Sequence, residues 1–296
     1  MPNDYGTRKY RSPYGNTVRQ RASRARVTAS WSIASVLVIG LSLGIGIASA
    51  RSGQPTTGHP SVHQAAAPEP PESWKLKFDA AFTGSNLDTH TWETCYPWAA
   101  SGCTNFGNTE FQWYLASQDK VRDGVLQLVA QREPTRGTNK NGEPKEYACR
   151  SGMVTSYPSL RFEYGYIEIT AEIPFGNGLW PAFWLAAANQ KWPPEIDILE
   201  HWGTELNGKA YLHPTTGPRQ SDVFNTPNLA SGWHTFSLYW TETQLIWYYD
   251  GNQVFSTTTG IPHQEMYLIA NLADYQPGPR TCAGSLLIKS VKLWQP

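Results

Sequence analysis

Two features are missing from this 296-residue sequence, and each absence excludes a class of fold. No window places apolar residues at the spacing of an amphipathic helix of three turns, which argues against a helical bundle. No segment repeats at a fixed period, which argues against a solenoid. A chain of this length is then expected to contain one large domain built from strands.

Charged residues are absent from residues 27–50, an apolar stretch that closes with Ala-Ser-Ala. Residues 1–26 before it hold seven of the 24 Lys and Arg residues and one acid. A basic lead followed by an apolar segment is typical of an export signal, and about 20 residues can also cross a bilayer. We therefore expect residues 1–28 to be a basic cytoplasmic lead and residues 29–50 to be a cleaved signal peptide or a retained membrane anchor.

The next segment, residues 51–73, is rich in Pro, Ala, Ser and Thr and has no apolar periodicity. Such a composition predicts a disordered linker. Residues 74–296 remain for a globular domain. Because basic residues ahead of an apolar segment keep that end in the cytoplasm, the domain is expected to be extracellular or at the cell surface.

Net charge is absent from the whole sequence, but the two ends differ. Residues 74–296 contain 16 Lys and Arg against 21 Asp and Glu, a net charge of −5. This sign argues against nucleic acid as a partner, because nucleic-acid binding needs cations for the phosphates. Twelve of the 13 tryptophans lie in the same segment. They favour contact with sugars, and the alternative is the ordinary aromatic content of a large β-sheet.

Cysteine is scarce, with four residues, and no Cys-x-x-Cys spacing suggests a metal site. In an exported chain four cysteines predict two disulfides, with free thiols as the alternative. Cys95 and Cys103 enclose a short loop, which favours that pair and leaves Cys149 with Cys282.

Segments with strand patterns recur at short spacing between turn signals. Residues 166–173 alternate isoleucine or alanine with polar side chains, which is the two-residue period of a strand with one buried face. Asp250-Gly251 predicts a hairpin turn. Strands are also predicted at 125–130, 234–240, 244–249, 252–258 and 286–294. The pattern predicts an all-β sandwich of two antiparallel sheets, in which a concave outer face would form a substrate cleft.

Residues 195–200 read EIDILE and place three carboxylates among apolar side chains. A helix would scatter the acids around its axis, and a regular strand would turn Glu200 away from Glu195 and Asp197. One extra residue, a β-bulge at Ile198-Leu199, would return Glu200 to the face of the other two. All three carboxylates are therefore expected to point into one cleft if the strand is bulged.

Three carboxylates this close cannot all be ionised near neutral pH, so at least one is expected to keep its proton. Hydrolysis of a glycosidic bond with retention needs a carboxylate nucleophile and a carboxyl proton donor, and a third acid can orient the nucleophile. Three other interpretations remain open from the residues alone. They are a solvated acidic face, a calcium site and a zinc site with His201 or His213.

These residues and the segments around them resemble glycoside hydrolase family 16, in its laminarinase-like branch. The matching segments are NTEFQWY (108–114), RFEYGYIEITAEIPFGNGLWPAFWL (161–185), PEIDILEHWG (194–203) and YLIANLA (267–273). The resemblance implies a β-jelly-roll sandwich and retaining endo-hydrolysis of β-linked glucans, here β-1,3- or mixed β-1,3-1,4-glucan. We expect a monomer whose partner is the polysaccharide, with no cofactor.

The resemblance also assigns residues. It implies Glu195 as the nucleophile, Glu200 as the general acid/base and Asp197 as the residue that assists Glu195. Trp192 is expected as the platform for the sugar at the cleaved bond, because an indole ring suits the apolar face of a pyranose. The full set of implied sugar contacts is Trp180, Trp184, Trp192, His213, Asn108, Glu110 and Asn271. Two of these residues have an alternative role: Trp184 could be part of the hydrophobic core, and His213 could be a structural histidine.

Some positions depart from the family pattern. Lys289 lies in the last strand, where many members have a calcium-binding aspartate, so no metal site is predicted. Asp274-Tyr275 replace a frequent Gly-Gly, and Tyr166 and Thr170 replace common arginines. These changes leave the sugar specificity open. The alternative functions are a transglycosylase, a hydrolase of another β-linked polysaccharide and a non-catalytic, lectin-like binder.

Overall fold

The computed structural model describes residues 70–98, 102–108, 110–227, 229, 231–275 and 282–296. The predicted lead (1–28), the predicted signal or anchor (29–50) and residues 51–69 of the predicted linker lie outside the described residues. The first strand begins at Lys75. Within the described ranges, no helix is long and apolar enough to cross a membrane.

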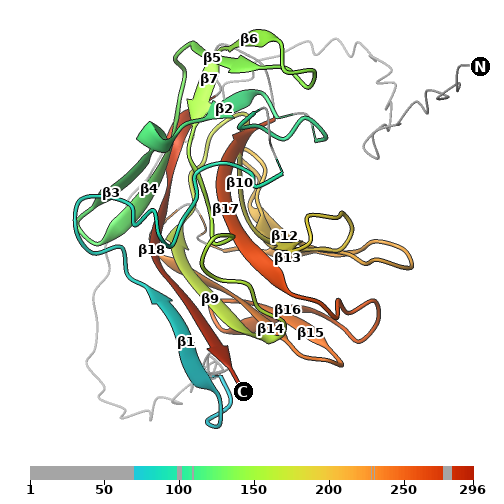
Figure 1. The fold of residues 1–296 in the computed structure, drawn as a ribbon. Coiled ribbons are helices and arrows are strands. Elements are labelled where there is room, and N and C mark those ends of the chain that lie inside the picture. The colour runs from blue at the N-terminus through green and yellow to red at the C-terminus, as the bar shows by residue number, and fades with distance from the viewer. Residues whose placement is uncertain (1–69, 99–101, 109, 228, 230, 276–281) are drawn as a thin grey trace, which may run out of the picture. The chain divides into compact units, whose positions relative to one another are not determined.

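Two sheets dominate the described part of the chain (Figure 1). The larger sheet runs in the order β16 (Asn252–Thr257), β15 (Leu245–Tyr249), β14 (His234–Trp240), β9 (Gly165–Glu172), β18 (Ala283–Gln295), β4 (Val125–Gln131), β7 (Cys149–Ser151) and β2 (Gln112–Tyr114). Two more strands join it, β1 (Lys75–Ala80) along β18 and β3 (Asp119–Arg122) along β4.

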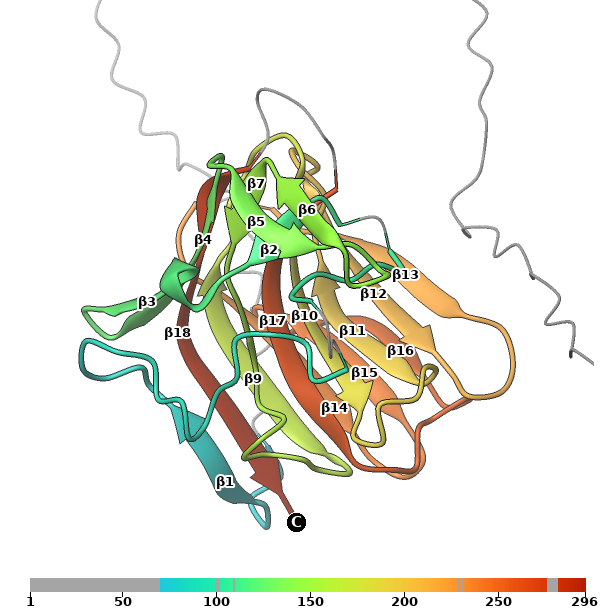
Figure 2. The ribbon, with the colours of Figure 1, turned by 45° about the horizontal axis from the view of Figure 1, so that its top comes forward.

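The smaller sheet has six strands in the order β13 (Gln220–Asn225), β12 (Asn207–His213), β11 (Glu195–Glu200), β10 (Leu179–Ala187), β17 (Met266–Asp274) and β8 (Met153–Thr155). A separate hairpin pairs β5 (Thr135–Thr138) with β6 (Pro144–Tyr147), above the sheets in Figure 2. A single 3-10 turn, η1, spans Ala116–Gln118. Among the described pairings, β2 with β7 is parallel, which the prediction of purely antiparallel sheets did not include.

The predicted strands are confirmed, and they correspond to β4, β9, β14, β15, β16 and β18. The Asp250-Gly251 hairpin is also confirmed, since β15 pairs with β16 across it. Both turn residues have positive φ, 47° for Asp250 and 75° for Gly251. Aspartate and glycine tolerate this left-handed conformation better than other residues, which is why the dipeptide is a reliable turn signal.

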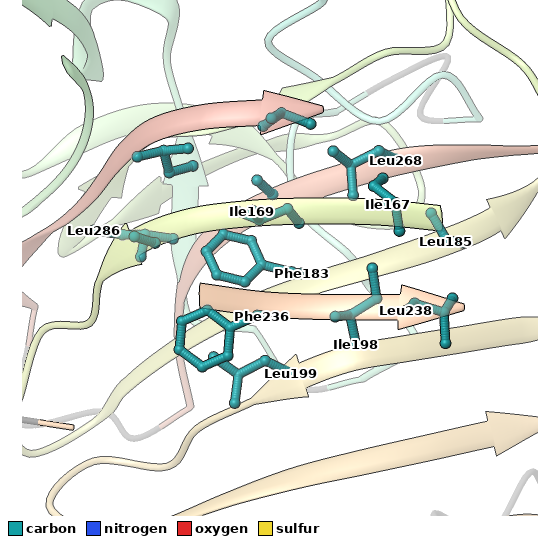
Figure 3. Packing of buried hydrophobic residues seen from close by; sticks show 14 of the residues in the cluster. Ile167, Ile169, Phe183, Leu185, Ile198, Leu199, Phe236, Leu238, Leu268 and Leu286 are labelled. Carbon is teal, nitrogen blue, oxygen red and sulfur yellow. The ribbon is translucent and has the colours of Figure 1, made fainter. Parts of the chain in front are cut away.

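The hydrophobic core lies between the inner faces of the two sheets (Figure 3). Its residues alternate along each strand with residues of the opposite face, as the two-residue period predicts. Each large side chain buried in this way contributes roughly 1.5–3 kcal/mol. Buried members from both sheets are Ile167, Ile169, Phe236, Leu238 and Leu286 on the larger sheet and Phe183, Leu185, Ile198, Leu199 and Leu268 on the smaller.

The smaller sheet also has a second, separate cluster on its other face. In β10, Phe183 and Leu185 enter the main core, whereas Ala182 and Trp184 belong to this second cluster. Its other members are Tyr96, Tyr114, Met153, Ala186, Tyr267 and Ile269. Trp184 is therefore not a residue of the main core, although only 8% of its surface is exposed.

Both predicted disulfides are confirmed, Cys95–Cys103 and Cys149–Cys282. The first closes a short loop beside the second cluster, and Cys103 packs against that cluster. The second joins β7 to the residue just before β18, and both of its cysteines are buried in the main core. The pairing followed from loop length, which is a property of the sequence.

Candidate active site

The bulge that the acidic segment requires is present in β11. Glu195 and Asp197 pair with β10 in one register and Glu200 in another, and the pairing with β12 shifts at the same place. Ile198 and Leu199 are both buried in the main core, which accounts for the extra residue. The three carboxylates consequently line one pocket on the opposite face.

Residues from four parts of the chain meet in this pocket. β11 supplies the acids, β10 supplies Trp180 and Trp184, and β17 supplies Asn271. The segment before β2 covers one side. Its lining residues are Tyr96, Asn105, Asn108 and Glu110. Sequence reasoning missed Tyr96, Asn105 and Ala182, which carry no motif of their own; the only signal for Tyr96 was its position beside Cys95.

Each glutamate receives a hydrogen bond from an indole. Trp180 Nε1 donates to Glu200 Oε1 at 2.9 Å, and this pair is buried. Trp192 Nε1 donates to Glu195 Oε2 at 3.1 Å. Trp192 itself is 60% exposed, so its ring remains free to meet a ligand at the open side of Glu195. Both indole donors orient a carboxylate and stabilise its charged form.

His213 lies beside two of the acids. Its Nε2 is 3.4 Å from Glu195 Oε1 and 3.6 Å from Asp197 Oδ2. Burial lowers the pKa of His213, and the negative charge of Glu195 opposes this effect. A histidine with a lowered pKa is neutral at pH 7 and can share one ring proton with the carboxylates. The structural alternative for His213 is therefore not favoured, because the ring faces the acidic cluster.

Burial raises the pKa of all three acids. Asp197, with 6% of its side chain exposed, has its pKa raised to about 8, while the positive charge of Arg219 lowers it in part. The pKa of Glu195 is raised well above its usual range by burial and then by the charge of Asp197. Their carboxylate oxygens and the His213 nitrogen lie within 4.8 Å of one another. The solvated-face interpretation is therefore wrong, since these groups are withdrawn from water.

Glu200 is more deeply buried than Glu195, with 8% of its surface exposed. Its pKa is also raised well above the usual range, first by burial and then by the charge of Asp197. The hydrogen bond from Trp180 and the charge of Lys209 act in the opposite direction. This shift favours the protonated form of Glu200, which is the form that can donate a proton.

Glu110 is a fourth buried carboxylate in the pocket. Its Oε1 accepts hydrogen bonds from Tyr96 at 2.9 Å and from Asn108 at 3.3 Å. Its Oε2 accepts from Gln112 Nε2 at 2.7 Å and from the Asn105 backbone at 3.0 Å. Burial raises the pKa of Glu110, and these donors reduce the shift. Glu110 thus ties Tyr96, Asn105, Asn108 and Gln112 together at one side of the pocket.

Asn271 connects two aromatic side chains of the second cluster. Its Oδ1 accepts a hydrogen bond from Trp184 Nε1 at 2.8 Å, and its Nδ2 donates to Tyr114 at 3.0 Å. These contacts fix the plane of the Trp184 indole at the wall of the pocket. Trp184 therefore forms part of the pocket wall from a nearly buried position, and its contact with a sugar stays a prediction.

The described residues offer one constellation of acids and histidine that fits a cation, namely Glu195, Asp197 and His213. It does not include His201, whose Nε2 donates to the Glu205 backbone carbonyl at 2.7 Å. The contacts of Glu195 with the Trp192 indole, and of both acids with the His213 imidazole, already account for the close approach of these three groups. Lys289, at the predicted vacant calcium position, lies 5.9 Å from the Trp233 ring. The absence of a metal stays a prediction.

The family model of the glycosyl hydrolases family 16 matches residues 107–277, which contain all three acids and every strand of the two sheets except β1 and β18. The chain belongs to this family. The resemblance to family 16 that the sequence motifs carry is thereby confirmed.

Two relatives are about one third identical to the chain over the segments that align. The endo-1,3-1,4-beta-glycanase EglC of Rhizobium meliloti is 35% identical over 196 residues, 62% of this chain and 42% of that protein. ExsH of the same organism, of the same named activity, is 34% identical over 202 residues, 64% of this chain and 43% of that protein. The chain therefore spans less than half the length of these two relatives.

Solved family 16 structures share the fold. A laminarinase from a Flavobacterium species superposes with a TM-score of 0.63 at 28% identity, covering 75% of this chain and all of that one, 100%. The catalytic domain of an endo-1,3-beta-glucanase from Thermotoga petrophila gives a TM-score of 0.66 at 24% identity, covering 75% and 98%. The predicted all-β jelly-roll sandwich is confirmed by this likeness.

Proposed function

We propose that this chain is a retaining endo-glycosidase that hydrolyses β-1,3- or mixed β-1,3-1,4-glucan by double displacement. The observation that carries the proposal is the bulged strand β11, which brings Glu195, Asp197 and Glu200 into one pocket walled by tryptophans. Membership of family 16 and the named activities of the two Rhizobium relatives support it.

In the first step, the Glu195 carboxylate attacks the anomeric carbon of the sugar. The bond to the leaving oxygen breaks, and Glu200 gives its proton to that oxygen. The raised pKa of Glu200 supports this role, because the donor must be protonated before the reaction. Its indole partner Trp180 keeps the carboxyl in one orientation.

In the second step, Glu200 is ionised and accepts a proton from water. The water oxygen attacks the anomeric carbon, the bond to Glu195 breaks, and the sugar leaves with its original configuration. Asp197 assists Glu195 by holding a proton near it, a role that its raised pKa supports. If another sugar hydroxyl replaces the water, the same site performs transglycosylation.

The proposed sugar contacts divide by exposure. Trp192 offers an exposed indole beside Glu195, which suits stacking on a pyranose ring. Asn108 is half-buried in the lining of the same pocket and is proposed to contact the sugar beside its hydrogen bond to Glu110. The more deeply placed Trp180, Trp184, His213, Glu110 and Asn271 are proposed to contact the sugar through their pocket-facing edges while their hydrogen bonds hold the wall in shape.

A panel of polysaccharides tests this function. The purified full-length chain is incubated with laminarin, lichenan, barley glucan, agarose and xyloglucan, and reducing ends are measured, with Glu200→Gln as the control. We expect release from laminarin or from the mixed-linkage glucans, lost in the control. Release from agarose or xyloglucan alone would show that the substrate is that polymer and not a β-1,3- or mixed-linkage glucan. Binding to a polymer without release of reducing ends would favour the lectin-like alternative.

The hydrogen bond from Trp180 provides a test by pH. Trp180→Phe removes a donor that stabilises the Glu200 carboxylate, so the pKa of Glu200 should rise further. The basic limb of the kcat/KM profile, which reports the acid that must be protonated, should move to higher pH. kcat/KM itself should fall on the order of tenfold.

Trp184→Phe is the matched control, because that indole donates to Asn271 and not to an acid. It should leave the basic limb in place. If both variants moved the limb equally, or if neither did, Glu200 would not be the group whose protonation controls the rate.

We also propose that the chain is exported and either released or tethered at the cell surface. The support is the basic lead at 1–28 and the apolar segment at 29–50, both outside the described residues. Two disulfides in residues 74–296 agree with an oxidising compartment.

A further inference from the structure

The face that holds the acids continues beyond them onto two more strands. In the pairing of β11 with β12, Asp197 lies opposite Tyr211 and Glu200 opposite Lys209. In the next pairing, Tyr211 lies opposite Ser221 and Lys209 opposite Val223. Residues directly opposite each other in an antiparallel pair share a face. The floor of the acidic pocket thus extends over β12 and β13 to the edge of the smaller sheet.

This extension carries two cations in a domain with a net charge of −5. The guanidinium carbon of Arg219 lies 5.1 Å from the ring centroid of Tyr211, and Arg219 is exposed. Lys209 Nζ lies 2.9 Å from Glu205 and 5.2 Å from the Trp202 ring. Lys209 is thus paired with Glu205, and Arg219 lies against Tyr211 with its side chain at the exposed surface.

Arg219 is also electrostatically close to the reaction centre. Its charge lowers the pKa of Asp197, of Glu200 and of His213. A sugar that lies across the acids and onto β12 would therefore pass within reach of the guanidinium. Stacking on Tyr211 restricts the motion of this exposed side chain, which reduces the entropy lost when a ligand binds there.

We infer that the floor over β12 and β13 is a binding site for carboxylate groups carried by the polysaccharide, with Arg219 as its main contact. The planar fork of an arginine matches a carboxylate with two parallel hydrogen bonds, and neutral glucan offers no such group. The substrate class is then a β-linked glucan with acidic substituents or acidic sugar units. This inference rests on the proposed glycosidase function and specifies its substrate.

Two forms of one polymer test the site. Laminarin and lightly carboxymethylated laminarin share a backbone and differ in charge, so kcat and KM are measured on both with the full-length chain. We expect a lower KM for the carboxymethylated form. Arg219→Gln should raise the KM for the carboxymethylated form about tenfold more than the KM for neutral laminarin, because only the charged polymer loses a charge-assisted hydrogen bond. The loss of the Arg219 charge from beside the three acids should change kcat by the same factor on both polymers.

Arg161→Gln is the matched control. Arg161 is exposed and lies 4.2 Å from the ring of Tyr157, the same arrangement of arginine on tyrosine. It follows β8, at the opposite edge of the smaller sheet from β13. The variant changes the net charge by the same amount, so it reports any general repulsion between the acidic domain and an anionic polymer. It should behave as the unaltered chain on both substrates.

Three results would overturn the inference. Arg219→Gln could raise the KM for both polymers by the same factor, which would assign Arg219 to the acids and not to the substrate carboxylates. Arg219→Gln could leave both KM values unchanged. Arg161→Gln could raise the KM for the carboxymethylated form as much as Arg219→Gln does. If the unaltered chain cleaves neither polymer, the proposed function fails by itself; affinity electrophoresis in gels with each polymer then decides the site, which requires Arg219-dependent retardation by the carboxymethylated form alone.

Discussion

Replacing Glu195 with alanine is expected to abolish turnover while the protein stays folded. The variant removes the atom that forms the covalent intermediate, so the rate should fall on the order of 10³-fold or more. The side chain lies at the pocket surface with 18% exposure, and its removal leaves the main core untouched. Initial rates on the substrate found in the panel, together with circular dichroism, measure both parts of the expectation.

Azide distinguishes a lost nucleophile from a damaged site. A small anion can enter the space that the Glu195 side chain vacated and attack the anomeric carbon from the same side. Activity should return in part, and the product should be a glycosyl azide of inverted configuration, detectable by NMR. Glu265→Ala, which removes an exposed carboxylate between β16 and β17, should keep full activity. Full activity of Glu195→Ala would refute the assignment of the nucleophile.

The disulfide between Cys149 and Cys282 is expected to contribute more to stability than the one between Cys95 and Cys103. The first spans 133 residues and the second spans 8. Chain entropy in the unfolded state predicts a loss of about 5 kcal/mol for the long loop and about half of that for the short one. A domain is typically stable by roughly 5–15 kcal/mol, so the first loss is a large fraction.

The paired variants Cys149→Ala with Cys282→Ala, and Cys95→Ala with Cys103→Ala, measure this difference by urea unfolding. If the long-loop variant does not fold, unfolding of the unaltered chain with and without reductant gives the combined contribution of both disulfides. Subtracting the loss measured for the short-loop variant then gives the contribution of Cys149–Cys282. An equal loss from both pairs, or a larger loss from the short loop, would contradict the entropic account. The short loop should instead affect activity, because Cys103 packs beside the aromatic cluster at the pocket.

Local chemistry accounts for what the sequence predicted correctly. The bulge at Ile198-Leu199 follows from the need to place two apolar residues inward and Glu200 outward, and side-chain alternation is a property of any strand. The Asp250-Gly251 turn follows from backbone preferences of two residues. The disulfide pairing follows from loop length. None of these needs information about how the sheets stack.

Other features were decided by tertiary structure alone. Trp184 was equally compatible with a core and with a cleft, and only the stacking of the larger sheet on one face of β10 assigned it to the other face. The four donors to Glu110, which belong to Tyr96, Asn105, Asn108 and Gln112, are brought together at one side of the pocket by the fold. No periodic pattern marks these four residues, so their common partner could not be predicted from spacing.

The sequence by itself determined the reactive groups of this protein: three acids, their common face, the strands around them and the family to which they belong. Tertiary structure decided what surrounds those groups. Arg219 and Asp197 are 22 positions apart, and the β12–β13 connection brings their charges into range. Residue type and alternation act over a few neighbours, whereas burial, pKa and the shape of a cleft depend on contacts between distant segments.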